Sequence, residues 1–432
     1  MRYLYIDNFR GFRHTLICLR DVNFLVGENS TGKSSLLSLL QLMDEFPNQY
    51  YPGLYMTDEV DLGAFGDIVS VWSSDRSYFK VAVVGISAQS DGDEVGLDFA
   101  VRTFENRDGI PHVKRFTALS QGRQTTFVFD RTRTRYRTIS AKSAYPSEEA
   151  ALEGFRTLLE AESSVSRGFR LLPSKYSPNP PIPIAMSLMR EQEKESPLAK
   201  SDLPFDLAPI EDLQWIAPIR AKSRRTYDAV SRPYSPEGEH APFVLRRSLK
   251  SGPRSSELVQ RLRDFGAASG LFETVRTHAF GRGSDAPFEV VVHFAGADLN
   301  ISNVGYGVSQ ALPLIVDFLT ARHQVAFAVQ QPEIHLHPRA QAALGGLLFE
   351  LALEGPHTLL VETHSDYVID RYRLSMKREE NPPGTQVLFF ERTASGNVVH
   401  SLLISNDGQY PAEQPPGFRD FFIREELELL GV

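Results

Sequence analysis

The spacing of apolar and polar residues predicts strands and helices in an α/β order. Two short apolar segments at residues 2–6 and 22–26 predict strands, and the leucines at positions 36, 37, 39 and 40 predict a helix over residues 33–46. Later in the chain, residues 325–329 and 358–362 each predict a buried strand, with a helix starting at Pro338 between them. This alternation favours parallel strands.

The middle of the chain has different patterns. Segments 78–86, 95–104, 111–119 and 125–129 predict an antiparallel sheet, whereas residues 145–215 read as helical with proline-rich breaks. A strand at 288–294 and a helix start near Gly305 follow. We therefore expect a first lobe at 1–140 with the antiparallel subdomain, a mainly helical insertion at 141–288, and a second lobe at 289–432. The two lobes should combine in one α/β head with a mixed sheet.

Composition narrows the class of protein. The 432 residues contain no apolar run near the roughly 20 residues of a membrane span. Charges at Asp7, Arg10 and Arg13 interrupt any signal-peptide core, so we expect a cytoplasmic protein. The one cysteine, Cys18, allows neither an internal disulfide nor a cysteine-based metal site.

The net charge of −8 argues against a chain that coats nucleic acid through its overall charge. Two basic clusters leave the question open. Arginines at 131, 133, 135 and 137 would share one face of a strand, and a second cluster covers residues 220–225. Either cluster could be a solvated face or a surface for phosphate or an acidic partner.

The strongest motif is the phosphate loop at residues 27–34, which matches G-x-x-x-x-G-K-[ST] between a strand and a helix. Its backbone N–H groups would surround ATP phosphates, Lys33 would contact the β- and γ-phosphates, and the Ser34 hydroxyl would bind Mg²⁺. The ATP-binding residues expected from this loop are Asn29, Ser30, Thr31, Gly32, Lys33, Ser34 and Ser35.

A second motif follows the strand at 325–329, where the sequence reads Q-Q-P-E-I-H-L-H-P from Gln330 to Pro338. Mg²⁺ and the attacking water sit beside such strand ends in P-loop ATPases. We expect Gln330 at the metal and Gln331 and Glu333 at the water. An amide cannot accept the proton that a carboxylate accepts, so we expect slow hydrolysis unless Glu333 or His364 compensates. His335 and His337 lack the further ligands of a metal site.

Two more motifs appear in the order typical of ABC ATPases. The turn N-V-G-Y-G-V-S-Q opens a helix, where Gly307 and Ser309 would bind the γ-phosphate held by a second copy. His364 follows the strand at 358–362, in the place of a switch histidine. Glu362 beside it has no role that the sequence assigns. Near the N-terminus, N-F-R-G-F places Arg10 as a phosphate contact.

Together these motifs resemble the SMC-like and OLD-type ABC ATPases, and the segments W-I-A-P-I-R from Trp215 and E-T-H-S-D-Y from Glu362 are similar to the AriA family of PARIS anti-phage defence systems. The resemblance implies an ATP- and Mg²⁺-dependent ATPase that forms a homo-oligomer of at least two copies. It also implies that the oligomer holds a TOPRIM-type, AriB-like nuclease and releases it when a phage protein is sensed.

The residues after His364 contain no D-x-D element of a TOPRIM domain, so we expect the nuclease on a partner chain. The alternative function is a DNA-repair or chromosome-maintenance ATPase that binds DNA through the two basic clusters. SMC-like relatives of that kind carry long heptad coiled coils, and none is visible here. A third possibility, ATP that only holds the oligomer together, overlaps with the defence function.

Overall fold

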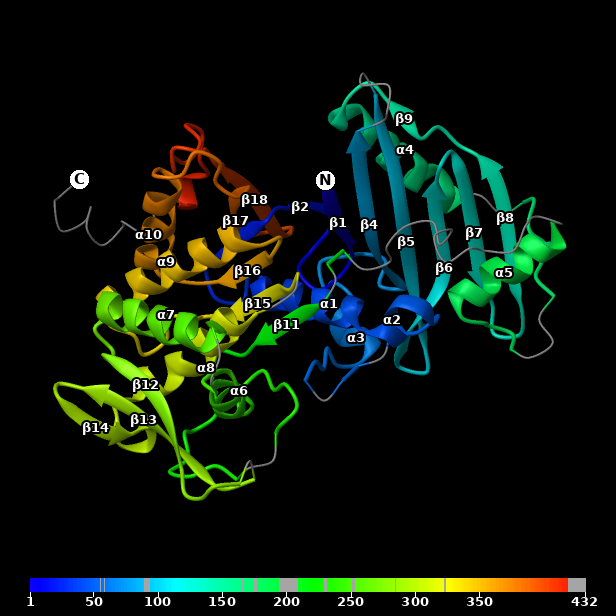
Figure 1. Cartoon of the computed structure of the whole chain (residues 1–432). Helices are drawn as coiled ribbons and strands as arrows, with labels where there is room; N and C mark the ends of the chain where they lie inside the picture. Colours follow the sequence, from blue (N-terminus) through cyan, green and yellow to red (C-terminus); the bar gives the residue numbers. More distant parts are fainter. Residues whose placement is uncertain are drawn as a thin grey trace. The chain divides into compact units, whose positions relative to one another are not determined.

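The computed structural model describes the chain except for residues 55, 58, 89–93, 165–166, 174–176, 194–208, 211, 229–230, 251–252, 284, 322–323 and 419–432. It contains two compact units (Figure 1). Unit 1 comprises Met1–Arg20, Asn29–Glu211 and Phe390–Val399, and unit 2 comprises Asp21–Glu28, Asp212–Phe389 and His400–Val432. The stretch expected as an insertion, 141–288, is divided between them, because its first helix packs on the sheet of unit 1 and its last on a helix of unit 2.

Unit 1 is built on an antiparallel sheet in the order β10-β8-β7-β6-β5-β4-β1-β2, with β9 paired to β5. The strands are β1 (Arg2–Asp7), β2 (Thr15–Leu19), β4 (Tyr78–Ala88), β5 (Val95–Arg107), β6 (Ile110–Ser120), β7 (Arg123–Phe129), β8 (Thr134–Ser140), β9 (Ala144–Tyr145) and β10 (Arg170–Leu171). All four strands expected between residues 78 and 129 are confirmed. The sequence analysis missed β2.

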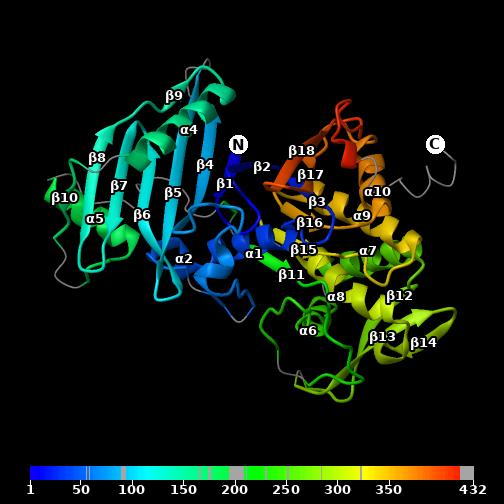
Figure 2. The ribbon, with the colours of Figure 1, turned by 180° about the vertical axis from the view of Figure 1, so that it is seen from behind.

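Helices of unit 1 include α1 (Lys33–Asp44), α2 (Phe46–Tyr50), α3 (Phe65–Ile68), α4 (Glu148–Ser164) and α5 (Ile182–Gln192). Helix α4 crosses one face of the sheet (Figure 2). Its Phe155 ring is buried against Tyr5 on β1 and Phe99 on β5, with centroid distances of 5.6 and 5.3 Å. Aromatic burial of this kind stabilises the unit by removing apolar surface from water.

Unit 2 is built on a sheet in the order β11-β15-β16-β3-β17-β18. Its strands are β11 (Leu213–Ile216), β15 (Ala326–Gln330), β16 (Thr358–Glu362), β3 (Val22–Gly27), β17 (Thr385–Thr393) and β18 (Gly396–Ile404). The end of β17 and the start of β18 belong to Phe390–Val399, which is part of unit 1. Strands β11, β15, β16 and β3 are parallel. The expected parallel pairing is confirmed. Every residue of β15 and β3 is buried, which explains their continuous apolar sequences.

The helices of unit 2 are α6 (Ala241–Ser248), α7 (Pro253–Ser269), α8 (Tyr306–Thr320), α9 (Pro338–Glu354) and α10 (Asp366–Met376). Helix α6 packs on α8, and α7 packs on α9. The antiparallel strands β12 (Thr274–Ala279), β13 (Phe288–Phe294) and β14 (Ala297–Asn300) and the 3-10 turn η2 (Ile301–Asn303) precede α8. Proline at the first position of α9 and the Ser365 hydroxyl that accepts from the Val368 N–H fix two helix starts. No helix among the described residues is long and apolar enough to span a bilayer.

Candidate nucleotide site

The phosphate loop has the backbone conformation that anion binding needs. Strand β3 ends at Gly27 and α1 begins at Lys33, and the left-handed φ angles between them are 146° at Gly27, 62° at Ser30 and 101° at Gly32. Such angles turn successive N–H groups toward one point. A β-carbon at Gly32 would lie 2.6 Å from Cζ of Phe12, so this position also needs glycine for space.

The expected loop residues differ in exposure. Thr31 and Lys33 are buried, whereas Asn29, Ser30 and Ser34 are exposed and Ser35 is half-buried. The exposed residues therefore present backbone and hydroxyl groups at the loop surface. The buried lysine stem at the start of α1 places its charge beside the positive end of that helix, where phosphate is stabilised.

Two arginines are hydrogen-bonded to this loop and helix. Arg10 Nη1 donates to the Ser35 hydroxyl at 2.9 Å, and burial lowers the pKa of Arg10. Arg392 Nη2 donates to the carbonyl oxygen of Ser30 at 2.8 Å. The structure thus places Arg10 beside the first turn of α1, and its contact with phosphate stays a prediction. Arg392 was missed, because no motif marks it and it comes from β17.

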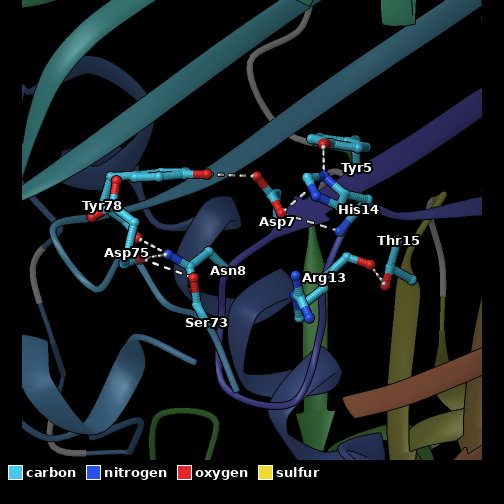
Figure 3. Close-up of polar contacts among 9 residues, drawn as sticks. All are labelled: Tyr5, Asp7, Asn8, Arg13, His14, Thr15, Ser73, Asp75 and Tyr78. Carbon is cyan, nitrogen blue, oxygen red and sulfur yellow. Dashed lines mark hydrogen bonds and ion pairs between the residues drawn. The ribbon is translucent and has the colours of Figure 1, made fainter. Parts of the chain in front are cut away.

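The turn that carries Arg10 is held by polar contacts (Figure 3). Asn8 has a φ of 58°, and its amide donates to the carbonyl oxygens of Asp75 and Tyr78 at 2.7 and 2.5 Å. The carboxylate of Asp7 accepts from the backbone N–H of His14 at 3.1 Å. These bonds offset the strain of left-handed backbone, which costs a non-glycine residue about 1 kcal/mol or more.

The end of β15 carries an amide in place of an acid, but the neighbouring strand supplies a carboxylate. Gln330 and Glu362 are direct partners in the β15–β16 register, and Gln330 Nε2 donates to Glu362 Oε2 at 3.0 Å. Trp215 Nε1 donates to Gln330 Oε1 at 3.0 Å. Both Gln330 and Glu362 are buried. We call Trp215, Gln330 and Glu362 the amide clamp. Glu362, to which the sequence assigned no role, accepts the hydrogen bond of the Gln330 amide in it.

Glu333 is a second carboxylate near this edge. Its Oε1 accepts from the backbone N–H of His364 at 2.7 Å, and its Oε2 has no hydrogen-bond partner among the described residues. Burial raises the pKa of Glu333. Gln331, with a φ of 43°, donates its backbone N–H to the carbonyl oxygen of Glu362 at 2.7 Å. The three expected catalytic residues Gln331, Glu333 and His364 are therefore linked to one strand end.

Gly27, Glu362 and Gln330 end the three adjacent parallel strands β3, β16 and β15. The carboxyl ends of parallel strands meet at one edge of a sheet, which is where ligands bind in α/β folds. The first residue of the phosphate loop thus shares an edge with the amide clamp. A magnesium ion at such an edge takes oxygen ligands, which Glu362 and the Gln330 amide offer here.

The signature turn is less exposed than expected. Ser309 lies in α8, is 7% exposed, and donates its hydroxyl to the carbonyl oxygen of Tyr306 at 2.8 Å. The exposed residues of the turn are Asn303, Gly305 and Tyr306. Gly307 packs so closely that a β-carbon there would lie 2.7 Å from the carbonyl oxygen of His335. The turn therefore contacts the segment that follows Glu333.

The two histidines of the second motif have structural contacts. His337 accepts from the Arg339 N–H as the N-cap of α9, and the His335 ring meets Tyr306 edge-on at 4.7 Å. Among the described residues, no three His, Cys, Asp or Glu side chains gather as a metal cluster. A magnesium ion carried by ATP does not need such a cluster, because phosphate and water supply most of its ligands.

Most arginines of the first basic cluster form ion pairs, and Arg220 of the second cluster is buried. Strand β8 begins at Thr134, so Arg131 and Arg133 lie in the preceding turn and not on the expected strand face. Arg131 pairs with Asp108 at 3.6 Å, and both Arg133 and Arg135 pair with Asp130. In the second cluster, Arg220 is 3% exposed. Arg220 therefore belongs neither to a solvated face nor to an exposed binding surface, because its side chain is buried in unit 2.

A parallel sheet that leads into a glycine-rich phosphate loop, with an acid and an amide at the neighbouring strand ends, defines an ABC-type P-loop nucleotide-binding head. The chain belongs to the AAA family described as "AAA domain, putative AbiEii toxin, Type IV TA system", whose sequence model matches residues 22–370. A comparison with curated proteins found no match.

Solved structures that resemble the chain include heads of SMC proteins. One is an SmcHead bound to the C-winged helix domain of ScpA, with 12% identity, 93% of this chain and 97% of that chain covered, and a TM-score of 0.44. Another is the SMC head domain from Thermotoga maritima, with 13% identity, 93% and 99% coverage and a TM-score of 0.38. A third is the Smc head from Pyrococcus furiosus bound to the C-terminal domain of ScpA, with 11% identity, 99% and 100% coverage and a TM-score of 0.41.

Proposed function

We propose that this protein is an ATP-binding, slowly hydrolysing switch whose copies associate through ATP. The observation that carries this proposal is the loop at residues 27–34, which combines left-handed backbone with a buried lysine, Lys33. Arg10, hydrogen-bonded to Ser35 just after the loop, adds a second positive charge that would attract a triphosphate. ATP held on one copy would be covered by the signature turn of a second copy, at Gly307 and Ser309. Because ATP stabilises the state it binds better, it would favour the associated form.

Hydrolysis would depend on Glu333. Its Oε2 is the oxygen available to accept a proton from the water that attacks the γ-phosphate, while Oε1 stays bound to the His364 N–H. Magnesium, when bound, would neutralise phosphate charge, with Ser34, Gln330 and Glu362 as the candidate ligands. The amide clamp fills hydrogen bonds of Gln330 and Glu362, so neither is a free base. We expect slow turnover, because Gln330 and Gln331 carry amides where carboxylates could take up the proton.

The biological role that we propose is a sensor and scaffold in anti-phage defence. The support is the sequence similarity to AriA-type ATPases at W-I-A-P-I-R from Trp215 and E-T-H-S-D-Y from Glu362. Under this proposal the ATP-bound oligomer holds a TOPRIM-type, AriB-like nuclease and releases it when a phage protein binds. The DNA-maintenance alternative is equally compatible with the fold, because the ion pairs of Arg131, Arg133 and Arg135 lie at the surface, where such pairs contribute little.

The test compares wild type with Lys33→Ala, and with Lys114→Ala as the control for a surface lysine on the distant strand β6. Loss of a charged phosphate contact should weaken ATP binding about 10- to 100-fold, from 1.5–3 kcal/mol per charged hydrogen bond. Isothermal titration calorimetry measures the affinity, and analytical ultracentrifugation with and without Mg²⁺–ATP measures association. Wild type that fails to bind ATP, or Lys33→Ala that binds equally well, refutes the proposal.

The defence role has a separate test. Wild type and Lys33→Ala are each co-expressed with a TOPRIM-type nuclease encoded beside the gene, and complexes are isolated under ATP. We expect capture by wild type and little capture by Lys33→Ala. Equal capture by both would separate partner binding from ATP and refute the switch.

A further inference from the structure

Arg220 is a buried cation whose side chain has no described hydrogen-bond partner. It is 3% exposed, and Nε, Nη1 and Nη2 each lack a partner among the described residues. Burial lowers the pKa of Arg220 to about 10, which still leaves the guanidinium charged at neutral pH. A buried charge without hydrogen bonds is costly, so a group of this kind calls for a specific role.

The acidic groups near Arg220 point to Glu333. The charges of Glu333 and Asp317 act on the guanidinium, Glu333 more strongly. Asp317 already has a partner, since its Oδ1 lies 2.8 Å from Nε2 of His240. Glu333 Oε2 is buried and lacks a partner among the described residues. The forked donor and the carboxylate oxygen follow two paired strands, because Ile216 of β11 lies opposite Val329 of β15, four residues before Arg220 and Glu333.

The backbone of Arg220 is tied to the signature helix α8. The Gln310 side chain accepts from the Arg220 N–H at 3.1 Å and donates to the Arg220 carbonyl oxygen at 3.2 Å. Gln310 is 2% exposed and directly follows Ser309. Two hydrogen bonds from one amide hold the Arg220 backbone on both sides, so Arg220 follows any movement of this part of α8.

The first turns of α8 lack one of the hydrogen bonds that would join them to the rest of the helix. Pro313 lies inside the helix and has no N–H, which removes the helical hydrogen bond to the Ser309 carbonyl oxygen. The same end of α8 contacts the chain near Glu333 through the Tyr306 and His335 rings. Two routes therefore join the signature turn to Glu333 within one copy.

We propose that Arg220 is a positioning residue that transmits contact at the signature turn to Glu333. This rests on the proposed function, in which the signature turn touches ATP held by a second copy. When that contact shifts α8, Gln310 carries Arg220 toward Glu333, and the guanidinium pairs with Oε2. The guanidinium takes one acceptor position of Oε2 and keeps the carboxylate ionised, while the second acceptor position of the same oxygen stays available to the attacking water, so each nucleotide site responds to the other.

The test uses Arg220→Met, which removes charge and donors, Arg220→Lys, which keeps the charge, and Arg224→Met as the control. Arg224 is an exposed arginine four residues away, paired with Glu239. Single-turnover hydrolysis of radiolabelled ATP should slow at least 10-fold in Arg220→Met, with the KM for ATP within 2-fold of wild type. Arg220→Lys should recover part of the rate, and Arg224→Met should match wild type. An unchanged rate in Arg220→Met overturns the proposal.

A double-mutant cycle with Glu333→Gln tests the pairing even where turnover is too slow to measure. Without ATP, the Tm changes of Arg220→Met and Glu333→Gln should add, because the side chains are unpaired. With Mg²⁺–ATP, the changes should not add. Additive Tm changes in both conditions overturn the proposal, whereas wild type that fails to bind ATP refutes the proposed function instead. Should Arg220→Met not fold, Arg220→Lys in the same cycle gives the answer.

Discussion

Replacing Gln330, the amide at the centre of the clamp, by glutamate tests whether this site holds a single negative charge. In wild type, Gln330 Nε2 donates to the buried Glu362 carboxylate at 3.0 Å. In Gln330→Glu an oxygen takes the place of that nitrogen, and two ionised carboxylates about 3 Å apart would repel by about 5.5 kcal/mol at an effective dielectric constant of 20. The pair avoids this by holding one proton, which donates the hydrogen bond that the amide donated.

The energy of holding that proton depends on pH. The pair's folded-state pKa is raised above the ordinary glutamate value, so stability is present at low pH and is lost as the pH rises. Relative to an ordinary glutamate pKa of about 4.3, holding the proton costs about 1 kcal/mol at pH 5 and about 5 kcal/mol at pH 8. For a unit of this size, the Tm of Gln330→Glu should therefore fall relative to wild type by roughly 10 °C between pH 5 and pH 8.

Differential scanning calorimetry at several pH values measures this change. Gln330→Met is the control, because it removes both hydrogen bonds of the clamp without adding a charge. It should lose about 3 kcal/mol at every pH, from one neutral and one charged hydrogen bond. A Gln330→Glu variant whose Tm runs parallel to wild type or to Gln330→Met from pH 5 to pH 8 would refute the clamp as described.

Three further predictions concern the base, the loop and the basic face. The hydrolysis rate should rise with pH above the ordinary glutamate range, because burial raises the pKa of Glu333 and the base must be ionised. Glu333→Gln should lower the rate about 100-fold or more and remove this rise. A rise that persists in Glu333→Gln contradicts the role of Glu333 as the base. Gly32→Ala should lower both Tm and ATP affinity, because its β-carbon would lie 2.6 Å from Phe12. Gly109→Ala has a φ of 88° but open space around the new β-carbon, so it should lower only Tm. Calorimetry measures the Tm and the ATP affinity of both variants. Arg137→Ala should leave the salt dependence of any DNA retention unchanged, because its guanidinium packs over Phe169 at 5.6 Å; a flatter salt slope in a filter-binding assay would contradict this.

Sequence patterns identified the elements that bear the site because each has a strong local signal. The phosphate loop needs glycine at positions with left-handed backbone, and Gly27 and Gly32 have that conformation. Strand β15 is buried on both faces, so its apolar run was visible without the fold. Strand β2 was missed because Thr15–Leu19 is only partly buried and has a mixed pattern.

Other expectations failed where tertiary packing overrides local pattern. Alternating arginines suggested one strand face, but the strand begins only at Thr134. Arg220 looked like part of a surface cluster, yet its backbone is fixed by Gln310 and its side chain is buried. The span 141–288 looked like one insertion, but helix α4 packs on β5 of unit 1 while α7 packs on α9 of unit 2. The local spacing of apolar residues does not show which distant segment a residue or helix packs against.

By itself, the sequence determined the phosphate loop, the order of the motifs and the strands and helices that bear them, since each depends on neighbours within a few residues of chain. Only the tertiary structure decided how the site is completed. Trp215 reaches Gln330 across 115 residues, Gln310 reaches Arg220 across 90, and Arg392 reaches Ser30 across 362. These side chains meet because strands and helices far apart in sequence pack together, and hydrogen-bond partners are chosen by that packing.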